Sequence, residues 1–207
     1  MFGMTAMVAC GDDNGGEGGG NSSETGDPVL LDEGFEGGIP DTWTNIDADG
    51  DGLSWMAAEG MGVNGSNAVV SISYDNQSGP INADNYLVSP TIHIPGAGGY
   101  TLTYSITNQQ AEYPDQYSCV VGTLENGTFS PIETLVTERV TTGRLEETGY
   151  TAKSFNLDAF KGQDICVAFH HQDYDAFVLC LDNVKISNEA KGNVSLASSK
   201  TTLRKVK

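Results

Sequence analysis

Alternation of apolar and polar residues dominates the chain from residue 27 onward. Apolar side chains occupy every second position over residues 100–106, 165–169 and 177–181. A fourth apolar run, over residues 69–74, follows this period less regularly. Because successive side chains of a strand point to opposite faces, a period of two predicts strands with one buried face.

Turn sequences separate these runs, and residues 157–160 alone predict a brief helical turn. The turns are Asn64-Gly65, Ser78-Gly79-Pro80, Pro95-Gly96, Asn126-Gly127 and Lys161-Gly162. Short strands at this spacing, without helices between them, predict an all-β fold. We expect an antiparallel β-sandwich or jelly roll.

The chain divides into three segments by composition. In residues 1–28, an apolar start leads to Cys10, in a run that resembles a bacterial lipobox, and a Gly-, Asn- and Ser-rich stretch follows. We expect a signal remnant, a lipid on Cys10 and a flexible tether there. Residues 29–187 form the predicted domain, and residues 188–207 a basic tail or linker. Because no run of 18 apolar residues exists, we expect membrane contact only through the lipid anchor.

Charge restricts the partners of the domain. The whole chain carries a net charge of −18, and residues 1–187 hold 27 acidic and 5 basic residues, a net charge of −22. Such a surface repels nucleic acid and anionic membranes and attracts cations. Nucleic-acid binding is therefore excluded as a function class.

An acidic loop has the spacing of a calcium site. Asp47, Asp49 and Asp51 alternate before Gly52, as in the first half of an EF-hand loop. The twelfth position of that motif is Ala58 instead of glutamate, which excludes a helical EF-hand. An acidic turn and a calcium-binding loop both remain open.

Catalytic motifs are missing from the sequence. It contains no GxSxG, HExxH or GxxxxGK motif. Of the three histidines, His93, His170 and His171, the last two end a predicted strand beside acidic residues and fit a metal or general-base role or a polar rim. We therefore favour a non-catalytic binding module, expected to be a monomer, over a polysaccharide-acting enzyme or an accessory carbohydrate-binding module.

Aromatic side chains are the expected ligand contacts of such a module. The candidates are Trp43, Trp55, Tyr113, Tyr117 and Tyr174. Core packing is the alternative role for the two tryptophans.

Three sequence blocks resemble a known family. Residues 35–55 (FEGGIPDTWTNIDADGDGLSW), 84–90 (DNYLVSP) and 155–186 resemble the cleaved-adhesin domains of gingipains and haemagglutinins, which are choice-of-anchor-J-like. Residues 11–14 resemble the acidic tag of Bacteroidetes surface lipoproteins. The resemblance implies a galactose-binding-like or MAM-like jelly roll on the outer membrane that binds calcium and adheres to a glycan or a host protein. Residues 108–150 match poorly, and we expect variable loops there.

The resemblance also implies a calcium site. It brings Glu36 and Asp182 onto one ion, while the aspartates of the acidic loop complete this site or form a second one. Beside Asp182, the apolar positions shift from odd numbers (Leu179, Leu181) to even ones (Val184). Such a shift predicts a β-bulge.

The last predicted strands contain two cysteines. If residues 163–170 and 176–183 form a hairpin, Cys166 faces Cys180 on the neighbouring strand. We therefore expect these two residues to lie close together, within reach of a disulfide.

Overall fold

The computed structural model describes residues 27–145 and 149–189. The helical elements of these ranges are two 3₁₀ turns, η1 (Val63–Gly65) and η2 (Asp158–Phe160). The second turn confirms the helical turn predicted at residues 157–160. Within the described ranges, no helix has the length and apolar character needed to cross a bilayer.

Six strands form one antiparallel sheet, sheet A, in the order β12-β9-β14-β4-β3, with β1 also paired to β14. They are β1 (Val29–Glu33), β3 (Met56–Ala58), β4 (Ala68–Ile72), β9 (Thr101–Asn108), β12 (Thr151–Asn156) and β14 (Val178–Ser187).

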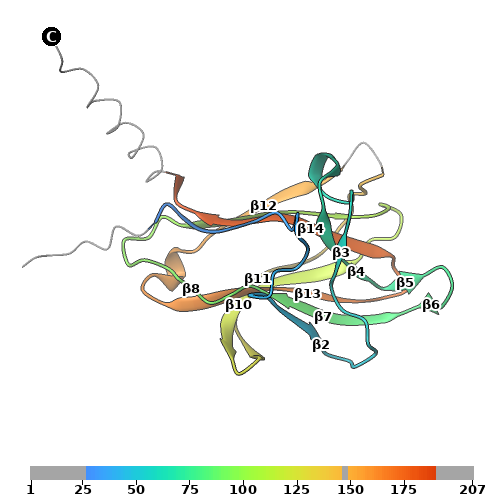
Figure 1. Cartoon of the computed structure of the whole chain (residues 1–207), viewed down its shortest axis with the longest axis horizontal. Coiled ribbons are helices and arrows are strands. Elements are labelled where there is room, and N and C mark those ends of the chain that lie inside the picture. Colours follow the sequence, from blue (N-terminus) through green and yellow to red (C-terminus); the bar gives the residue numbers. More distant parts are fainter. Residues whose placement is uncertain (1–26, 146–148, 190–207) are drawn as a thin grey trace, which may run out of the picture.

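Six further strands form sheet B, in the order β11-β10-β13-β7-β2, with β8 also paired to β13. They are β2 (Thr44–Asp47), β7 (Asn82–Val88), β8 (Ile92–His93), β10 (Gln116–Glu125), β11 (Thr128–Arg139) and β13 (Asp164–Tyr174). Strands β5 (Tyr74–Asp75) and β6 (Gly79–Pro80) form a small ribbon at one end. The two sheets stack face to face, which confirms the predicted antiparallel sandwich (Figure 1).

The core lies between the sheets and follows the predicted period of two. On β13, Ile165, Val167 and Phe169 are buried in the main cluster between the layers. The intervening Cys166 and Ala168 belong to a separate apolar cluster on the outer face of sheet B. A third cluster, with Val70 and Cys180, lies on the outer face of sheet A, so each sheet buries its inner face and carries a smaller apolar patch on its outer face.

Strand β14 contains the predicted bulge. Its pairing with β9 skips between Asp182 and Lys185, and Asn183 adopts φ 53°. The extra residue moves the buried positions from Leu179 and Leu181 to Val184, all of which lie in the main core. Asp182 precedes the bulge and lies on the outer side of sheet A, like Cys180, where it meets the η1 turn.

The predicted hairpin of the last two strands is wrong. Strand β13 lies in sheet B and β14 in sheet A, so the chain crosses between the layers instead of turning back within one. Cys166 lies opposite Gly122, whereas Cys180 lies opposite Val70 and Thr107. Both thiols are free and buried, as is that of Cys119.

The expectation of variable loops over residues 108–150 is also corrected. Strands β10 and β11 fill much of this segment as a long hairpin, with two register shifts in their pairing. Strand β11 lies at the edge of sheet B, and most of its residues are exposed or half-buried. An exposed edge strand does not need apolar residues at every second position, which hid it from the pattern.

A buried polar network joins the two sheets, and its members are Ser71, Ser73, Asn85, Asp115 and His171. His171 of sheet B lies with Nδ1 2.8 Å from the Oγ of Ser71, in sheet A, and with Nε2 3.0 Å from Asp115 Oδ1. Ser73 donates its hydroxyl to the same Asp115 oxygen at 2.5 Å. The Asp115 carboxylate is fully buried, so it depends on these donors.

We predict that Asp115→Ala lowers the free energy of unfolding by about 3–5 kcal/mol, because its buried partners lose their acceptor. Urea denaturation measures the change. Asp164→Ala is the matched control, since Asp164 lies 2.7 Å from His93 in a pair whose Asp side chain is 69% exposed. We expect the control to cost less than about 1 kcal/mol. Equal losses in the two variants would contradict the assigned role of the network.

Candidate functional site

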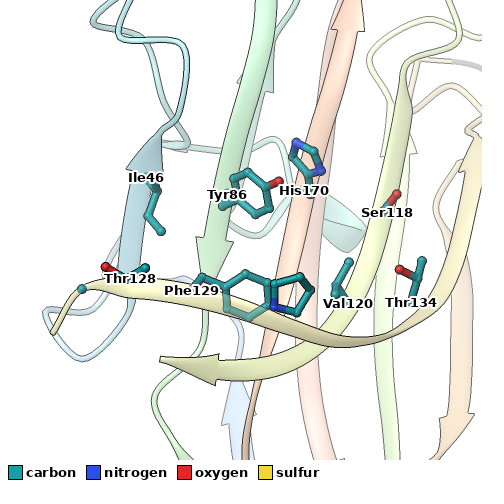
Figure 2. A pocket seen from close by; sticks show the side chains of 10 residues that line it. Ile46, Tyr86, Ser118, Val120, Thr128, Phe129, Thr134 and His170 are labelled. Carbon is teal, nitrogen blue, oxygen red and sulfur yellow. The ribbon is translucent and has the colours of Figure 1, made fainter. Parts of the chain in front are cut away.

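A groove lies on the outer face of sheet B, where the start of β11 crosses β2, β7 and β13 (Figure 2). Its volume is about 550 Å³. The lining residues come from strands β2, β7, β10, β11 and β13 and from the β10–β11 turn: Ile46, Tyr86, Ser118, Val120, Gly127, Thr128, Phe129, Pro131, Thr134 and His170. The hairpin of β10 and β11 thus provides one wall of the groove.

Aromatic rings form the centre of the groove. The rings of Tyr86 and His170 stack with their centroids 3.8 Å apart and an interplanar angle of 7°. The ring of Phe129 lies 6.1 Å from that of Tyr86. Figure 2 shows Tyr86 and His170 side by side on adjacent strands, with Phe129 reaching toward them from the start of β11.

The polar groups of the groove are uncharged. Burial lowers the pKa of His170, although the contact of its Nε2 with Asp84 Oδ1 at 2.6 Å opposes this shift. The imidazole is therefore neutral at neutral pH, donates Nε2–H to Asp84 and keeps Nδ1 as an acceptor. Burial also raises the pKa of Tyr86, so its hydroxyl stays protonated. No lysine or arginine lines the groove.

The sequence pattern did not single out Tyr86 or Phe129 as contacts, and it left the role of His170 open. These residues come from three strands, and their meeting depends on the order of those strands in sheet B. The available signal was local: Tyr86 and His170 each lie on the face of their strand opposite the core positions Leu87 and Phe169.

The aromatic residues expected to bind ligand divide into two groups. Trp43 is 6% exposed, Tyr117 1% and Trp55 2%, so all three pack in the core. The expectation that Trp43 and Tyr117 are exposed contacts is therefore corrected. Tyr113 and Tyr174 are 51% and 62% exposed, but neither lines the groove.

Glu36 and Asp182 both bind the segment 62–67, which contains η1. Asp182 Oδ2 accepts hydrogen bonds from Val63 N at 2.8 Å and Ser66 Oγ at 3.1 Å. Glu36 Oε2 accepts one from Asn67 N at 3.3 Å. Glu36 and Asp182 are 146 positions apart in the sequence, yet both accept hydrogen bonds from this short segment.

Oxygen atoms converge beside Gly62 in this segment. A β-carbon built on Gly62 would lie less than 3.0 Å from the main-chain oxygen of Asn67, Ser66 Oγ and Asp182 Oδ2. Asp182 is fully buried, and within the described ranges it has no ion-pair partner. Carbonyl, hydroxyl and carboxylate oxygens are the donor types that calcium takes in proteins, so this set fits the ion expected from the sequence resemblance.

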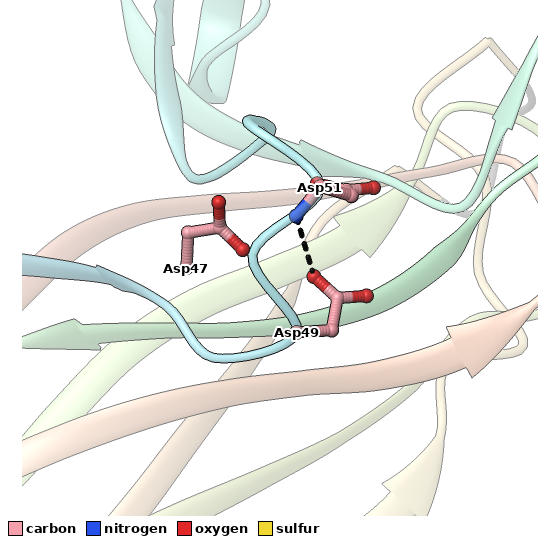
Figure 3. Close-up of side chains that lie close together, drawn as sticks. All are labelled: Asp47, Asp49 and Asp51. Carbon is pink, nitrogen blue, oxygen red and sulfur yellow. Dashed lines mark hydrogen bonds between the residues drawn. The ribbon is translucent and has the colours of Figure 1, made fainter.

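The acidic loop forms a separate cluster. Asp47, Asp49 and Asp51 each place a carboxylate oxygen within 4.8 Å of the others, and neither Glu36 nor Asp182 belongs to this group (Figure 3). The hydrogen bond from Gly52 N, with a further one from Gly50 N, lowers the pKa of Asp47. The loop therefore orients its carboxylates through its own backbone, with the three side chains partly or fully exposed.

Ser71, His171 and Asp115 share the order of contacts of a catalytic triad. All three residues are 0% exposed, and the Ser71 hydroxyl accepts a further hydrogen bond from Asn85 Nδ2 at 3.1 Å. A substrate cannot reach this hydroxyl between the sheets. The arrangement is therefore structural, and the polar-rim role is wrong for His171.

The predicted lipid-bearing Cys10, the tether and residues 190–207 of the basic tail lie outside the described residues.

Residues 29–186 match the Cleaved Adhesin Domain family. Hemagglutinin A of Porphyromonas gingivalis is 38% identical over 121 residues, which cover 56% of this chain and 4% of that protein. The crystal structure of the K3 cleaved adhesin domain of Lys-gingipain from the same organism is 33% identical, with a TM-score of 0.63 over 76% of this chain and 96% of that one.

A xylan-binding domain of family 22 from Paenibacillus barcinonensis shares the fold. Its identity is 14% and its TM-score 0.52, over 77% of this chain and 93% of that one. The family match covers most of the chain and agrees with the three sequence blocks and the sandwich. The chain belongs to the cleaved adhesin family.

Proposed function

We propose that this domain is a non-catalytic adhesion module that binds a neutral glycan in the groove of sheet B. The observation that carries the proposal is the aromatic lining formed by Tyr86, Phe129 and His170. Aromatic rings offer apolar faces to sugar rings, while the neighbouring hydroxyl and imidazole groups pair with sugar hydroxyls. The xylan-binding domain with the same fold supports this ligand class.

The charge of the groove and of the whole protein limits the class of glycan that can bind. No basic side chain lines the groove, and the chain as a whole is strongly acidic. A sulfated or carboxylated sugar would lack a counter-charge there and would be repelled. The ligand is therefore a neutral sugar chain, held along an open groove.

We predict that Tyr86→Ala weakens binding to a neutral polysaccharide about tenfold, a loss of about 1.4 kcal/mol. Tyr86→Phe keeps the ring and separates its contribution from that of the hydroxyl. Affinity electrophoresis in gels that contain xylan, galactan or mannan measures the effect, with polygalacturonate as the acidic comparison.

Met56→Ala is the control for this series, because Met56 is an apolar side chain of sheet A, 38% exposed and outside the groove. Its binding should equal that of the unchanged protein. If the polysaccharide slowed the migration of Tyr86→Ala as much as that of the unchanged protein, the groove would be rejected as the binding site. Release of reducing sugar by the purified protein would favour the enzyme alternative.

We also propose that a calcium ion binds between Glu36, Asp182 and the segment 62–67. The ion would neutralise the buried Asp182 carboxylate and join the turn after β1, the η1 segment and β14. The converging oxygens beside Gly62 support this proposal. The acidic loop of Asp47, Asp49 and Asp51 remains a separate candidate.

A chelator should lower the melting temperature, and added calcium should restore it. A ligand that binds only the folded state stabilises it by about 2.7 kcal/mol at 100 times its dissociation constant. Glu36→Ala and Asp182→Ala should each abolish the calcium response in differential scanning calorimetry, whatever their own stability, whereas Asp164→Ala should keep it. If Asp47→Ala alone abolished the response, the ion would belong to the acidic loop.

The proposed location is the outer surface of the outer membrane, through a lipid on Cys10. Hemagglutinin A, a relative, carries the name of a cell-binding protein, which supports a surface location. We predict that Cys10→Ser moves the full-length protein from the membrane fraction to the soluble fraction, as measured by immunoblotting. An unchanged distribution would remove the lipoprotein proposal, while the groove would remain testable with the soluble protein.

A further inference from the structure

A second pocket lies at the loop end of the sandwich, away from the groove. Three segments build it: the β5–β6 ribbon, the loop between β9 and β10, and the connection from β13 to β14. The lining residues are Tyr74, Asn76, Gln110, Tyr113, Asp175, Ala176 and Phe177. Its volume of about 480 Å³ lies in the range of ligand pockets, about 300–1,000 Å³.

Three aromatic rings line this pocket, and those of Tyr74 and Tyr113 are both steeply inclined to that of Phe177. The ring of Phe177 lies 6.3 Å from that of Tyr74, at 54°, and 6.1 Å from that of Tyr113, at 60°. Rings inclined in this way can surround a small group on several sides, as the walls of a box do. A sugar ring, by contrast, stacks on the flat face of a single ring. Ring faces carry negative electrostatic potential, so a box of this kind attracts a cation.

The polar groups that line the pocket also favour a cation. Asp175 contributes an exposed carboxylate, and the amide oxygens of Asn76 and Gln110 are further acceptors. None of the lining residues is basic. Arg139, which donates to Pro114 O nearby, is paired with Asp173 at 2.6 Å. The excess acidic charge of the chain adds long-range attraction for a positively charged partner.

The pocket is held in shape by the buried polar network. Phe177 N donates to Asp115 Oδ2 at 3.3 Å, and Ser73 N donates to Phe177 O at 2.9 Å. Asp175 N and Ile81 N both donate to Ser73 O. The backbone at Asp175 and Phe177 is therefore fixed before any ligand arrives, which reduces the entropy cost of binding.

We propose that this end pocket binds a lysine or arginine side chain of a partner protein. The cation enters between the rings of Tyr74, Tyr113 and Phe177, and the Asp175 carboxylate accepts its N–H groups. The domain then has two separate sites, a groove for a neutral glycan and an end pocket for a basic protein segment.

The test uses a blocked pentapeptide with one central lysine, added to the ¹⁵N-labelled full chain. We expect NMR shift changes at residues 74–78, 110–115 and 174–178, and weaker binding as salt concentration rises. An arginine peptide should bind the same residues. Peptides with acetyl-lysine or norleucine keep the length but lack the charge, and they should bind at least tenfold more weakly.

Two substitutions remove the same charge from different places. Asp175→Asn keeps the shape of the side chain, and asparagine tolerates the left-handed conformation of this position, φ 59°. We expect it to weaken lysine-peptide binding about tenfold, as should Tyr113→Ala. Asp164→Asn lies outside the pocket and should leave the binding unchanged.

Three outcomes would overturn the proposal. They are equal binding of the charged and uncharged peptides, equal weakening by Asp175→Asn and Asp164→Asn, and an absence of shifts at the three loops. Shifts at these loops caused by a neutral methyl glycoside, without any caused by the lysine peptide, would reassign the pocket to sugars.

Discussion

The fully buried carboxylate of Asp115 is the constraint on which the loop end of the molecule depends. Because water cannot solvate it, protein donors must do so, and they come from segments far apart in the sequence: the residue after β4, strand β13 and the residue before β14. Satisfying one charge therefore fixes the positions of several loops. The same network also joins sheet A to sheet B through Ser71 and His171.

The sequence predicted the individual strands better than their arrangement. The period of two identified β9, β13 and β14, and the phase shift after Leu181 identified the bulge, because burial on one face leaves a local mark on the sequence. The same pattern does not show which sheet holds β14. Apolar residues alternate in the same way around Cys180 whether the strand is the hairpin neighbour of β13 or lies in the other sheet. The edge strand β11 was missed because solvent tolerates almost any residue there.

The candidate sites were predictable only where one short segment supplies the chemistry. The carboxylates of Asp47, Asp49 and Asp51 could be grouped from spacing alone, and Glu36 and Asp182 only from resemblance to a family. The groove joins Tyr86, Phe129 and His170 from three strands, so it follows from strand order and register. Trp43 and Tyr117 misled the prediction because an aromatic residue has the same appearance in a sequence whether it packs in the core or lies on the surface.

The start of the first strand, β1, and the end of the last strand, β14, lie side by side at one end of the domain. Val29 pairs with Ser187, and Asn188 N donates to Pro28 O at 2.7 Å, at the end of the sandwich opposite the β5–β6 ribbon (Figure 1). A mechanical load between the chain ends and a partner held at the loop end would run along the strand axes. The hydrogen bonds between strands lie across that direction, so many of them resist such a load in shear at the same time. A load between the two chain ends would instead separate β1 from β14 one bond after another.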